Sequence, residues 1–299
     1  MRFDEFAINE VTVDNVRINV AVGGSGPPVL LLHGYPETHI MWREVAPMLA
    51  ERFTIVAPDL RGYGDSDRPR PSADHLTYSK RVMAADQFGV MRTLGHEHFA
   101  VVGHDRGGRV AHRLALDVPD AVTRLAVLDI VPTLHMFENV DRAMAATYFH
   151  WFFLARTDGL PERLIGSDPE AWLRSRFAER NAGGRRLDED AFSEYLRCFS
   201  APEAIAASCA DYQSAATIDV DHDRADRDAG RRVTAPLLAL WGAKSYVGQN
   251  FDVAAVWRNY ANDVQGEAIE ADHYLPEEQP EQTAERLMTF LDAREQVEQ

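Results

Sequence analysis

The chain has 299 residues, 45% of them hydrophobic, which is enough for one large domain with an inserted subdomain. Its formal net charge of -16 argues against nucleic acid or an anionic membrane surface as a partner, because both attract basic proteins. No apolar run of about 18 residues is present and the N-terminal stretch is acidic, so we expect neither a membrane span nor a signal peptide, and a cytoplasmic location.

Short apolar segments alternate with helical patterns along most of the chain. Strands are predicted at residues 11–22, as a hairpin turning at Asp14 and Asn15, and at 28–33, 54–58, 99–103, 124–129, 237–241 and 267–271. Helices are predicted at residues 79–94, 107–117 and 279–294. This alternation predicts an α/β protein with a mostly parallel, doubly wound sheet.

A long segment interrupts the series of strands. Residues 132–235 are rich in helix formers and aromatic residues and show no strand alternation. We therefore predict that residues 1–131 and 236–299 form the α/β core and that residues 132–235 form a helical cap. The last part of the cap, residues 219–232, is dense in acids and arginines, and we expect a solvated hinge there.

A Gly-x-Asp-x-Gly pattern centred on Asp105 follows the predicted strand at 99–103 and leads into a helix. A nucleophile on a sharp turn between a strand and a helix needs small residues two positions before and after it, and Gly103 and Gly107 meet this need. The pattern predicts that Asp105 stands above the sheet as a nucleophile, where a serine is more usual. The alternative is that Asp105 only caps the following helix.

A second segment, His33-Gly34-Tyr35-Pro36, follows the predicted strand at 28–33. The backbone N–H of Tyr35 and that of Arg106, at the start of a helix, would form an oxyanion hole for an ester on Asp105. The loop at residues 59–66 is a further match, and over essentially its full length the chain resembles the α/β-hydrolase superfamily. The resemblance implies an α/β-hydrolase fold with an inserted helical cap.

His273 lies between the last predicted strand and the last helix, where this superfamily keeps its catalytic histidine. Taken alone, a histidine beside an acid is more often a surface or capping residue. The acid that orients the histidine can follow either the strand at 124–129 or the strand at 237–241, and only the first ends in a carboxylate, Asp129. We therefore expect a triad of Asp105, Asp129 and His273, with a helix cap as the alternative role of Asp129.

A carboxylate nucleophile suits displacement at a saturated carbon, which leaves an ester that activated water can cleave. Dehalogenases and epoxide hydrolases both work in this way. An epoxide needs acidic O–H donors, for which Tyr148 and Tyr212 are the candidate pair, whereas a halide needs several N–H and O–H donors and no proton. His150 and Trp151 offer adjacent ring N–H donors, although on an aromatic-rich helix core packing explains them equally well.

Two arginines complete the pattern around the nucleophile. Arg106 and Arg109 are spaced for one helix face, and guanidinium groups match carboxylate geometry. With these residues the chain closely resembles the fluoroacetate (haloacetate) dehalogenase family. The resemblance implies that Asp105, Asp129 and His273 are the catalytic residues. It implies that Arg106 and Arg109 bind the substrate carboxylate. It also implies that His150, Trp151 and Tyr212 bind the halide.

The resemblance also implies a reaction. Halide would be displaced hydrolytically from a small anionic 2-haloacid through an aspartyl ester, giving glycolate from a haloacetate, and the protein would be a homodimer. No cofactor is implied, and Cys198 and Cys209 indicate neither a metal site nor a disulfide. Asp272 stands where the family usually has glycine, which could change the pKa of His273 or the shape of its loop.

Two other functions stay open at this point. An epoxide hydrolase of the same fold would form a diol without any dependence on halide. A ligand receptor without catalytic activity would be expected to have lost a residue of the triad, and all three residues are present.

Overall fold

The computed structural model describes residues 2–178 and 187–293, and eight strands of these residues form one sheet. The order is β1-β2-β4-β3-β5-β6-β7-β8, with β1 and β2 antiparallel to their neighbours and the other pairs parallel. The predicted mostly parallel sheet is therefore confirmed. The strands are β1 (Ala7–Val13), β2 (Val16–Gly24), β3 (Pro28–Leu32), β4 (Thr54–Pro58), β5 (Phe99–His104), β6 (Val122–Leu128), β7 (Leu237–Gly242) and β8 (Val264–Ile269).

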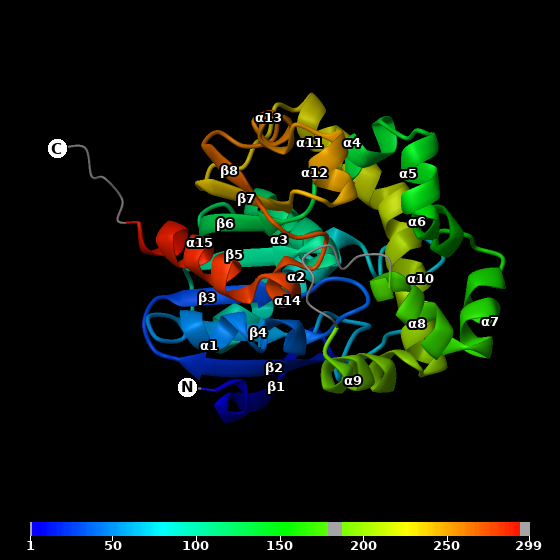
Figure 1. The fold of residues 1–299 in the computed structure, drawn as a ribbon, viewed down its shortest axis with the longest axis horizontal. Helices are drawn as coiled ribbons and strands as arrows, with labels where there is room; N and C mark the ends of the chain where they lie inside the picture. The colour runs from blue at the N-terminus through cyan, green and yellow to red at the C-terminus, as the bar shows by residue number, and fades with distance from the viewer. Residues whose placement is uncertain (1, 179–186, 294–299) are drawn as a thin grey trace.

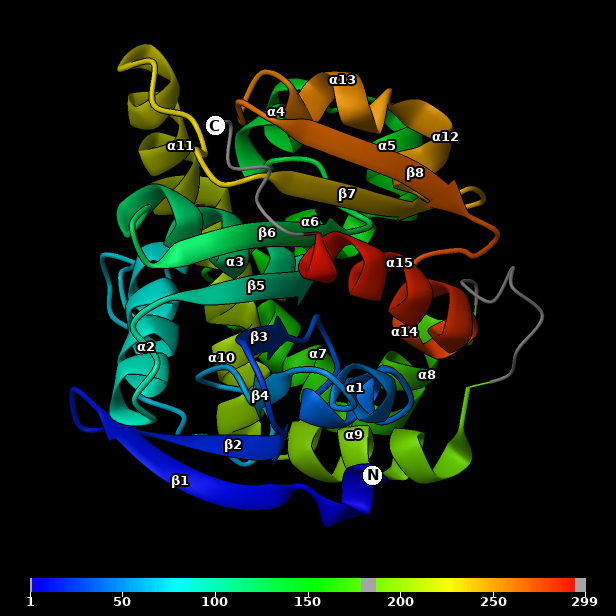
Figure 2. The same ribbon diagram turned by 90° about the vertical axis from the view of Figure 1, so that its left-hand side faces the viewer.

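The central strands are apolar runs because helices cover both faces of the sheet. All six residues of β5 are buried. Figure 2 shows α1 (Val45–Leu49) and α15 (Pro280–Asp292) on one side of the sheet and α2 (Lys80–Thr93) on the other, where α3 (Asp105–Asp117) packs against α2. The doubly wound arrangement is confirmed.

The helices between β6 and β7 gather beside the sheet, and we keep the name cap for residues 132–235. Figure 1 shows α5 to α10 stacked on the right of the sheet. These helices are α4 (Thr133–Glu138), α5 (Arg142–Thr147), α6 (Phe149–Leu154), α7 (Leu160–Ser167), α8 (Pro169–Ala178), α9 (Glu189–Phe199) and α10 (Pro202–Ser214), followed by the π-helix η3 (Ala215–Asp219) and α11 (Val220–Asp228).

Short helices complete the described chain. They are η1 (Phe3–Glu5), η2 (His39–Trp42), α12 (Tyr246–Asn250), α13 (Val253–Trp257) and α14 (Leu275–Glu278). Over residues 2–178 and 187–293, every helix is too short or too polar to span a bilayer.

Four local predictions differ from the structure. Strand β1 begins at Ala7, four residues before the start of the predicted hairpin. The segment at 219–232 is mostly exposed, as expected, but its largest part is helix α11 and Asp226 is buried in ion pairs with Arg113 and Arg231, both at 2.5 Å. Strand β8 begins three residues earlier than predicted, because it is an edge strand whose middle residues are exposed and polar or small. The last helix ends at Asp292, and residue 294 lies outside the described residues.

Candidate active site

Asp105 lies on a sharp turn, as the first residue of α3 and directly after β5. Its φ of +43° is in the left-handed region, which costs about 1–3 kcal/mol for a residue other than glycine. The turn has no room for neighbouring side chains, because a Cβ on Gly107 would lie 2.3 Å from the backbone oxygen of His33. A Cβ on Gly103 would lie 2.5 Å from the backbone oxygen of Gly107. The two glycines therefore have the steric role that the sequence pattern predicts.

The carboxylate of Asp105 is buried and points toward the loop after β3. Its Oδ2 accepts a hydrogen bond from the backbone N–H of Tyr35 at 3.1 Å. Burial raises the pKa of Asp105, but the positive charges of His273, His104 and the two arginines of α3 outweigh it, and the pKa lies below its usual value. The carboxylate is therefore ionised at neutral pH, as a nucleophile must be.

Asp129, directly after β6, and His273, in the loop after β8, lie close together at the carboxyl ends of these strands. The ring Nδ1 of His273 donates to Asp129 Oδ2 at 2.6 Å. The other oxygen of Asp129 accepts from the backbone N–H of Gly242 at 3.0 Å and from the hydroxyl of Ser245 at 2.6 Å. The carboxylate thus has a fixed orientation, and it holds one ring nitrogen of the histidine.

The loop that carries His273 is held by Glu278 at the end of α14. Its two carboxylate oxygens accept from the backbone N–H groups of Asp272 and Tyr274, each at 2.8 Å. The residues on both sides of His273 are therefore bound to one side chain. Asp272 enters this arrangement through its backbone N–H, so any residue type except proline can supply that contact.

A second buried histidine lies behind the first. His104 Nε2 contacts the backbone oxygen of His273 at 2.8 Å, and His104 Nδ1 contacts Glu37 Oε2 at 3.2 Å. Burial lowers the pKa of His104, but the hydrogen bond and charge of Glu37 raise it above its ordinary value. His104 and Glu37 therefore form a buried polar pair that supports the backbone at His273.

A narrow chamber joins these groups to the cap. Its volume is about 10 Å³, roughly the space of one water molecule. Residues of the core and of the cap both line it, namely Tyr35, Asp105, Arg109, Asp129, Tyr148, His150, Trp151, Arg176, Tyr212, His273 and Tyr274.

The three residues expected to bind halide come together in this chamber. The ring of Tyr212 lies 5.7 Å from that of His150 and 6.1 Å from that of Trp151, measured between centroids. All three side chains are buried. Tyr35 of the core packs edge-on against Tyr212, with ring centroids 5.3 Å apart, so it lies beside these three rings of the cap.

The two arginines of α3 have different surroundings. Arg109 lines the chamber and stacks on Trp151 at 4.6 Å. Arg106 is not among the described residues that line the chamber, and its Nε and Nη2 bind the carboxylate of Asp211 at 3.2 and 2.5 Å. Its guanidinium stacks on Tyr212 at 4.2 Å. The spacing predicts one helix face for both arginines. In the structure, Asp211 of the cap binds Arg106, whereas Arg109 lies at the chamber wall.

Asp211 is the centre of a buried ionic cluster that joins the cap to the core. It binds Arg106 of α3, Lys80 at the start of α2 and the hydroxyl of Tyr63, the last at 2.6 Å. The Arg106, Lys80 and Asp211 side chains are almost completely buried. A cluster of this kind is stable only while the charges balance, because buried ions without a partner are costly.

We expect Asp211→Asn to reduce the free energy of unfolding by about 3–5 kcal/mol, since it leaves two buried cations without their carboxylate. Chemical denaturation of the variant measures this loss. The matched control is Asp221→Asn, whose carboxylate binds Arg224 at 2.8 Å on the exposed face of α11. The free energy of unfolding of this control variant should fall by less than about 1 kcal/mol. Equal stability of the two variants would contradict the role of Asp211.

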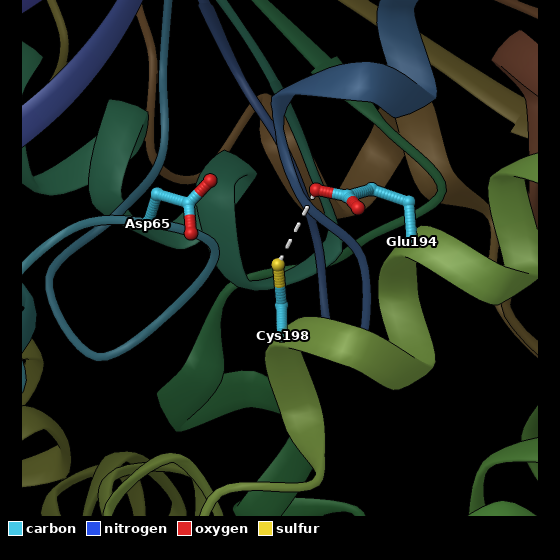
Figure 3. Close-up of side chains that lie close together, drawn as sticks. All are labelled: Asp65, Glu194 and Cys198. Carbon is cyan, nitrogen blue, oxygen red and sulfur yellow. Dashed lines mark hydrogen bonds between the residues drawn. The ribbon is translucent and has the colours of Figure 1, made fainter.

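A separate group of possible metal ligands lies at the surface between the loop after β4 and α9. Figure 3 shows Asp65, Glu194 and Cys198, whose ligand atoms lie within 4.8 Å of one another. Arg197 already contacts all three, at 2.8, 2.6 and 3.2 Å. Burial also raises the pKa of the Cys198 thiol, so it keeps its proton. A guanidinium supplies the countercharge of this cluster, and we assign no metal to it.

Several residues of the site had no part in the sequence predictions. Ser245 lies three residues after the end of β7 and His104 lies inside the glycine pattern, so both stand close to recognised motifs. Glu37 carries no local signal, because it acts through His104, 67 residues away, and Arg176 comes to the chamber only through the packing of the cap. Glu278 acts locally, on backbone groups four and six residues before it.

Comparison with known proteins agrees with the fold. The family described as alpha/beta hydrolase fold matches residues 27–280. A fluoroacetate dehalogenase from Burkholderia sp is 44% identical over 299 residues, covering 99% of this chain and 98% of the relative. A soluble epoxide hydrolase from Corynebacterium sp. (strain C12) is 34% identical over 292 residues, covering 96% and 98%. A crystal structure from Nostoc sp PCC 7120 superposes with a TM-score of 0.94 at 49% identity, covering 98% and 100% of the two chains.

Proposed function

The chain belongs to the haloacetate dehalogenase family of the α/β-hydrolase superfamily and is a hydrolase, and we propose that it displaces halide from a small 2-haloacid through an aspartyl ester. A haloacetate would give glycolate and halide. The proposal is supported by the fluoroacetate dehalogenase relative and by one feature of the chamber, the buried guanidinium of Arg109.

Arg109 is a buried cation whose hydrogen-bond partners are neutral. It donates to the backbone oxygen of Val131 at 3.0 Å and to the hydroxyl of Thr133 at 3.1 Å, and no carboxylate in the described residues forms an ion pair with it. Burial, and then the charge of Arg106, lower the pKa of Arg109 to about 10, so nearby acids do not offset its loss of water. A substrate carboxylate in the chamber would supply this countercharge.

The first step would form the ester. Oδ2 of Asp105 is held by the N–H of Tyr35, so Oδ1 attacks the carbon that carries the halogen. The carbon–oxygen bond forms as the carbon–halogen bond breaks, and the electron pair of the broken bond leaves with the halide. The N–H and O–H groups of His150, Trp151 and Tyr212 would receive this anion in a nearly dry chamber.

The second step would hydrolyse the ester. Because Nδ1 of His273 donates to Asp129, Nε2 is the atom that takes a proton from the attacking water. The oxyanion would be stabilised by the N–H of Tyr35 and by that of Arg106, one of the first N–H groups of α3, which have no partner within the helix. Collapse breaks the bond to the glycolate oxygen, which takes up the proton from His273. The second proton of the water is then lost to solvent, which restores the carboxylate of Asp105.

Halide release from chloroacetate and fluoroacetate, measured side by side with glycolate formation, tests the proposal. We expect one glycolate per halide released. Chloroacetamide, a neutral analogue of similar size, should have a kcat/KM at least about 30-fold lower than chloroacetate, because loss of one partner of a buried charge pair costs about 2 kcal/mol or more. Release of halide from neither acid would refute the proposal.

An epoxide hydrolase is the second candidate, and one observation favours it. Tyr148 and Tyr212 both line the chamber, which is where two phenols would have to lie to protonate an opening epoxide. A relative at 34% identity is a soluble epoxide hydrolase. A neutral epoxide would not compensate the charge of Arg109, which is why we rank this function second. Diol formation from a small terminal epoxide, with no halide release from either haloacid, would reverse this order.

We also propose a homodimer located in the cytoplasm. Four exposed apolar side chains lie on the cap, where they could form a subunit interface, namely Val140, Phe149, Phe152 and Leu164. Cys198 and Cys209 are both free, as is usual in a reducing compartment. Sedimentation at the mass of a single chain would contradict the dimer, and recovery from the extracellular fraction would contradict the location.

A further inference from the structure

Tyr35 is a core residue whose side chain lies among the helices of the cap. Its ring packs against those of His150 on α6, Phe199 on α9 and Tyr212 on α10, with centroids 6.4, 6.1 and 5.3 Å apart. Its hydroxyl accepts a hydrogen bond from Nε1 of Trp172 on α8 at 2.7 Å. One side chain of the loop after β3 therefore contacts four helices of the cap.

The backbone of the same residue faces the nucleophile. The N–H of Tyr35 donates to Oδ2 of Asp105 at 3.1 Å. In the proposed reaction this oxygen becomes the carbonyl oxygen of the ester, and it gains the negative charge when water attacks. A donor that stabilises such a charge must be held to within about 0.5 Å of its best position. The position of Tyr35 should therefore affect the rate of ester hydrolysis.

The hydrogen bond to Trp172 helps to hold Tyr35 in place. A tyrosine side chain has two rotatable bonds, so a hydrogen bond at the hydroxyl and another at the backbone N–H fix the residue at both ends. Trp172 is itself packed against the rings of Phe149 and Phe153 on α6, with centroids 6.0 and 5.5 Å apart. Its N–H is thereby directed at the hydroxyl of Tyr35.

Loss of this hydrogen bond should disturb the buried residue. Tyr35 is 3% exposed, so a hydroxyl that loses its donor is left unsatisfied or shifts toward another donor. A shift of the ring is passed to the backbone N–H through two bonds of limited freedom. Trp172 is not among the described residues that line the chamber, so it can act on the reaction only through such a neighbour.

We propose that Trp172 is a positioning residue for the oxyanion hole. Its N–H fixes the hydroxyl of Tyr35 and, through the ring, the backbone N–H that faces the ester on Asp105. This inference rests on the proposed function, because it assumes that ester. It concerns one of the two chemical steps. Displacement of halide does not need the donor, because the charge on Oδ2 falls as the ester forms.

The rate constants of the two steps test this role. Trp172→Phe removes the N–H and keeps an aromatic ring. With saturating chloroacetate, acid quenching and mass spectrometry give the fraction of chains that carry a carboxymethyl group, and this fraction together with kcat gives both rate constants. We expect ester hydrolysis to slow about tenfold, less than the roughly 10²–10³-fold loss when a whole oxyanion donor is removed. Ester formation should change less than about twofold.

A second variant removes the same hydrogen bond from its other end. Tyr35→Phe lacks the hydroxyl and keeps the backbone N–H, and it should slow hydrolysis by a similar factor. The double variant Trp172→Phe with Tyr35→Phe should be no slower than either single variant, because both remove one shared interaction. Tyr35→Phe also tests the proposal if Trp172→Phe fails to fold.

Tyr195→Phe is the matched control for a general loosening of the cap. The hydroxyl of Tyr195 on α9 donates to Glu277 Oε1 of α14 at 2.6 Å, which is another hydrogen bond between the cap and the core. Glu277 keeps its ion pair with Arg43 at 2.5 Å in this variant, and Tyr195 is not among the described residues that line the chamber. Both rate constants should match those of the unchanged protein.

Three results would overturn the positioning role. The first is equal slowing of ester formation and hydrolysis in Trp172→Phe, which indicates a general loss of structure. The second is unchanged hydrolysis in either single variant, and the third is a double variant in which the two effects multiply. If the unchanged protein forms no ester and releases no halide, the proposed function itself is refuted.

Discussion

An Asp105→Ala variant should release no measurable halide from chloroacetate, a loss of at least about 10⁴-fold in kcat. The reason is that the chamber offers no substitute nucleophile. Asp129 is the other carboxylate in its described wall, and both of its oxygens are bound, to His273 on one side and to Gly242 and Ser245 on the other. Halide measured by ion chromatography over long incubation gives the residual rate.

The control for this experiment is another aspartate far from the chamber. Asp221→Ala removes a carboxylate that is 68% exposed and should leave halide release unchanged. Circular dichroism of both variants checks that the fold is kept. Halide release by Asp105→Ala within about tenfold of the unchanged protein would mean that water displaces the halide directly, and the aspartyl ester would have to be abandoned.

His273→Asn should separate the two halves of the reaction. Ester formation needs no proton transfer, so each site should release one halide and then stop. Hydrolysis of the ester should slow by about 10²–10⁴-fold, the usual contribution of a general base. Mass spectrometry of the digested protein should then find one added carboxymethyl group on the peptide that contains Asp105.

The double variant Asp105→Ala with His273→Asn serves as the matched control and should show neither the burst of halide nor the added mass. A burst without a modified peptide would place the ester on another residue. An unmodified peptide with no burst would mean that His273 acts before or during displacement, which contradicts the order of steps proposed for this site.

The accuracy of the predictions depended on how local each feature is. The hairpin at Asp14 and Asn15 is confirmed, and both residues have the positive φ of a tight turn. The buried strands were predicted to within one or two residues, because apolar runs mark strands that are covered on both faces. Edge strand β8 was placed three residues late, because its exposed middle carries no such run.

The charged residues at the end of the cap include a contact between distant parts of the chain, which no local pattern predicts. Residues 219–232 are mostly exposed, as their composition predicts, yet Asp226 is buried with two arginine partners. Charge density along the chain indicates that the segment is exposed, but it does not identify the residue that finds a buried partner. Here Arg113 comes from α3, in the core.

The sequence by itself determined where Asp105, Asp129 and His273 stand, since each follows a strand and parallel strands end at one edge of the sheet. Asp105 also needs a turn that only its neighbouring glycines permit. These are properties of a few consecutive residues, and they can be read without the fold.

Only the tertiary structure decided which arginine faces the chamber. Arg106 and Arg109 are equivalent by spacing, but Asp211, 105 residues further along the chain, binds Arg106 and leaves Arg109 at the chamber wall. Arg176 likewise became part of the site only when α8 packed over the core. A side chain's direction in a buried site depends on the charges that pack against it, and those come from distant segments that no local pattern can specify.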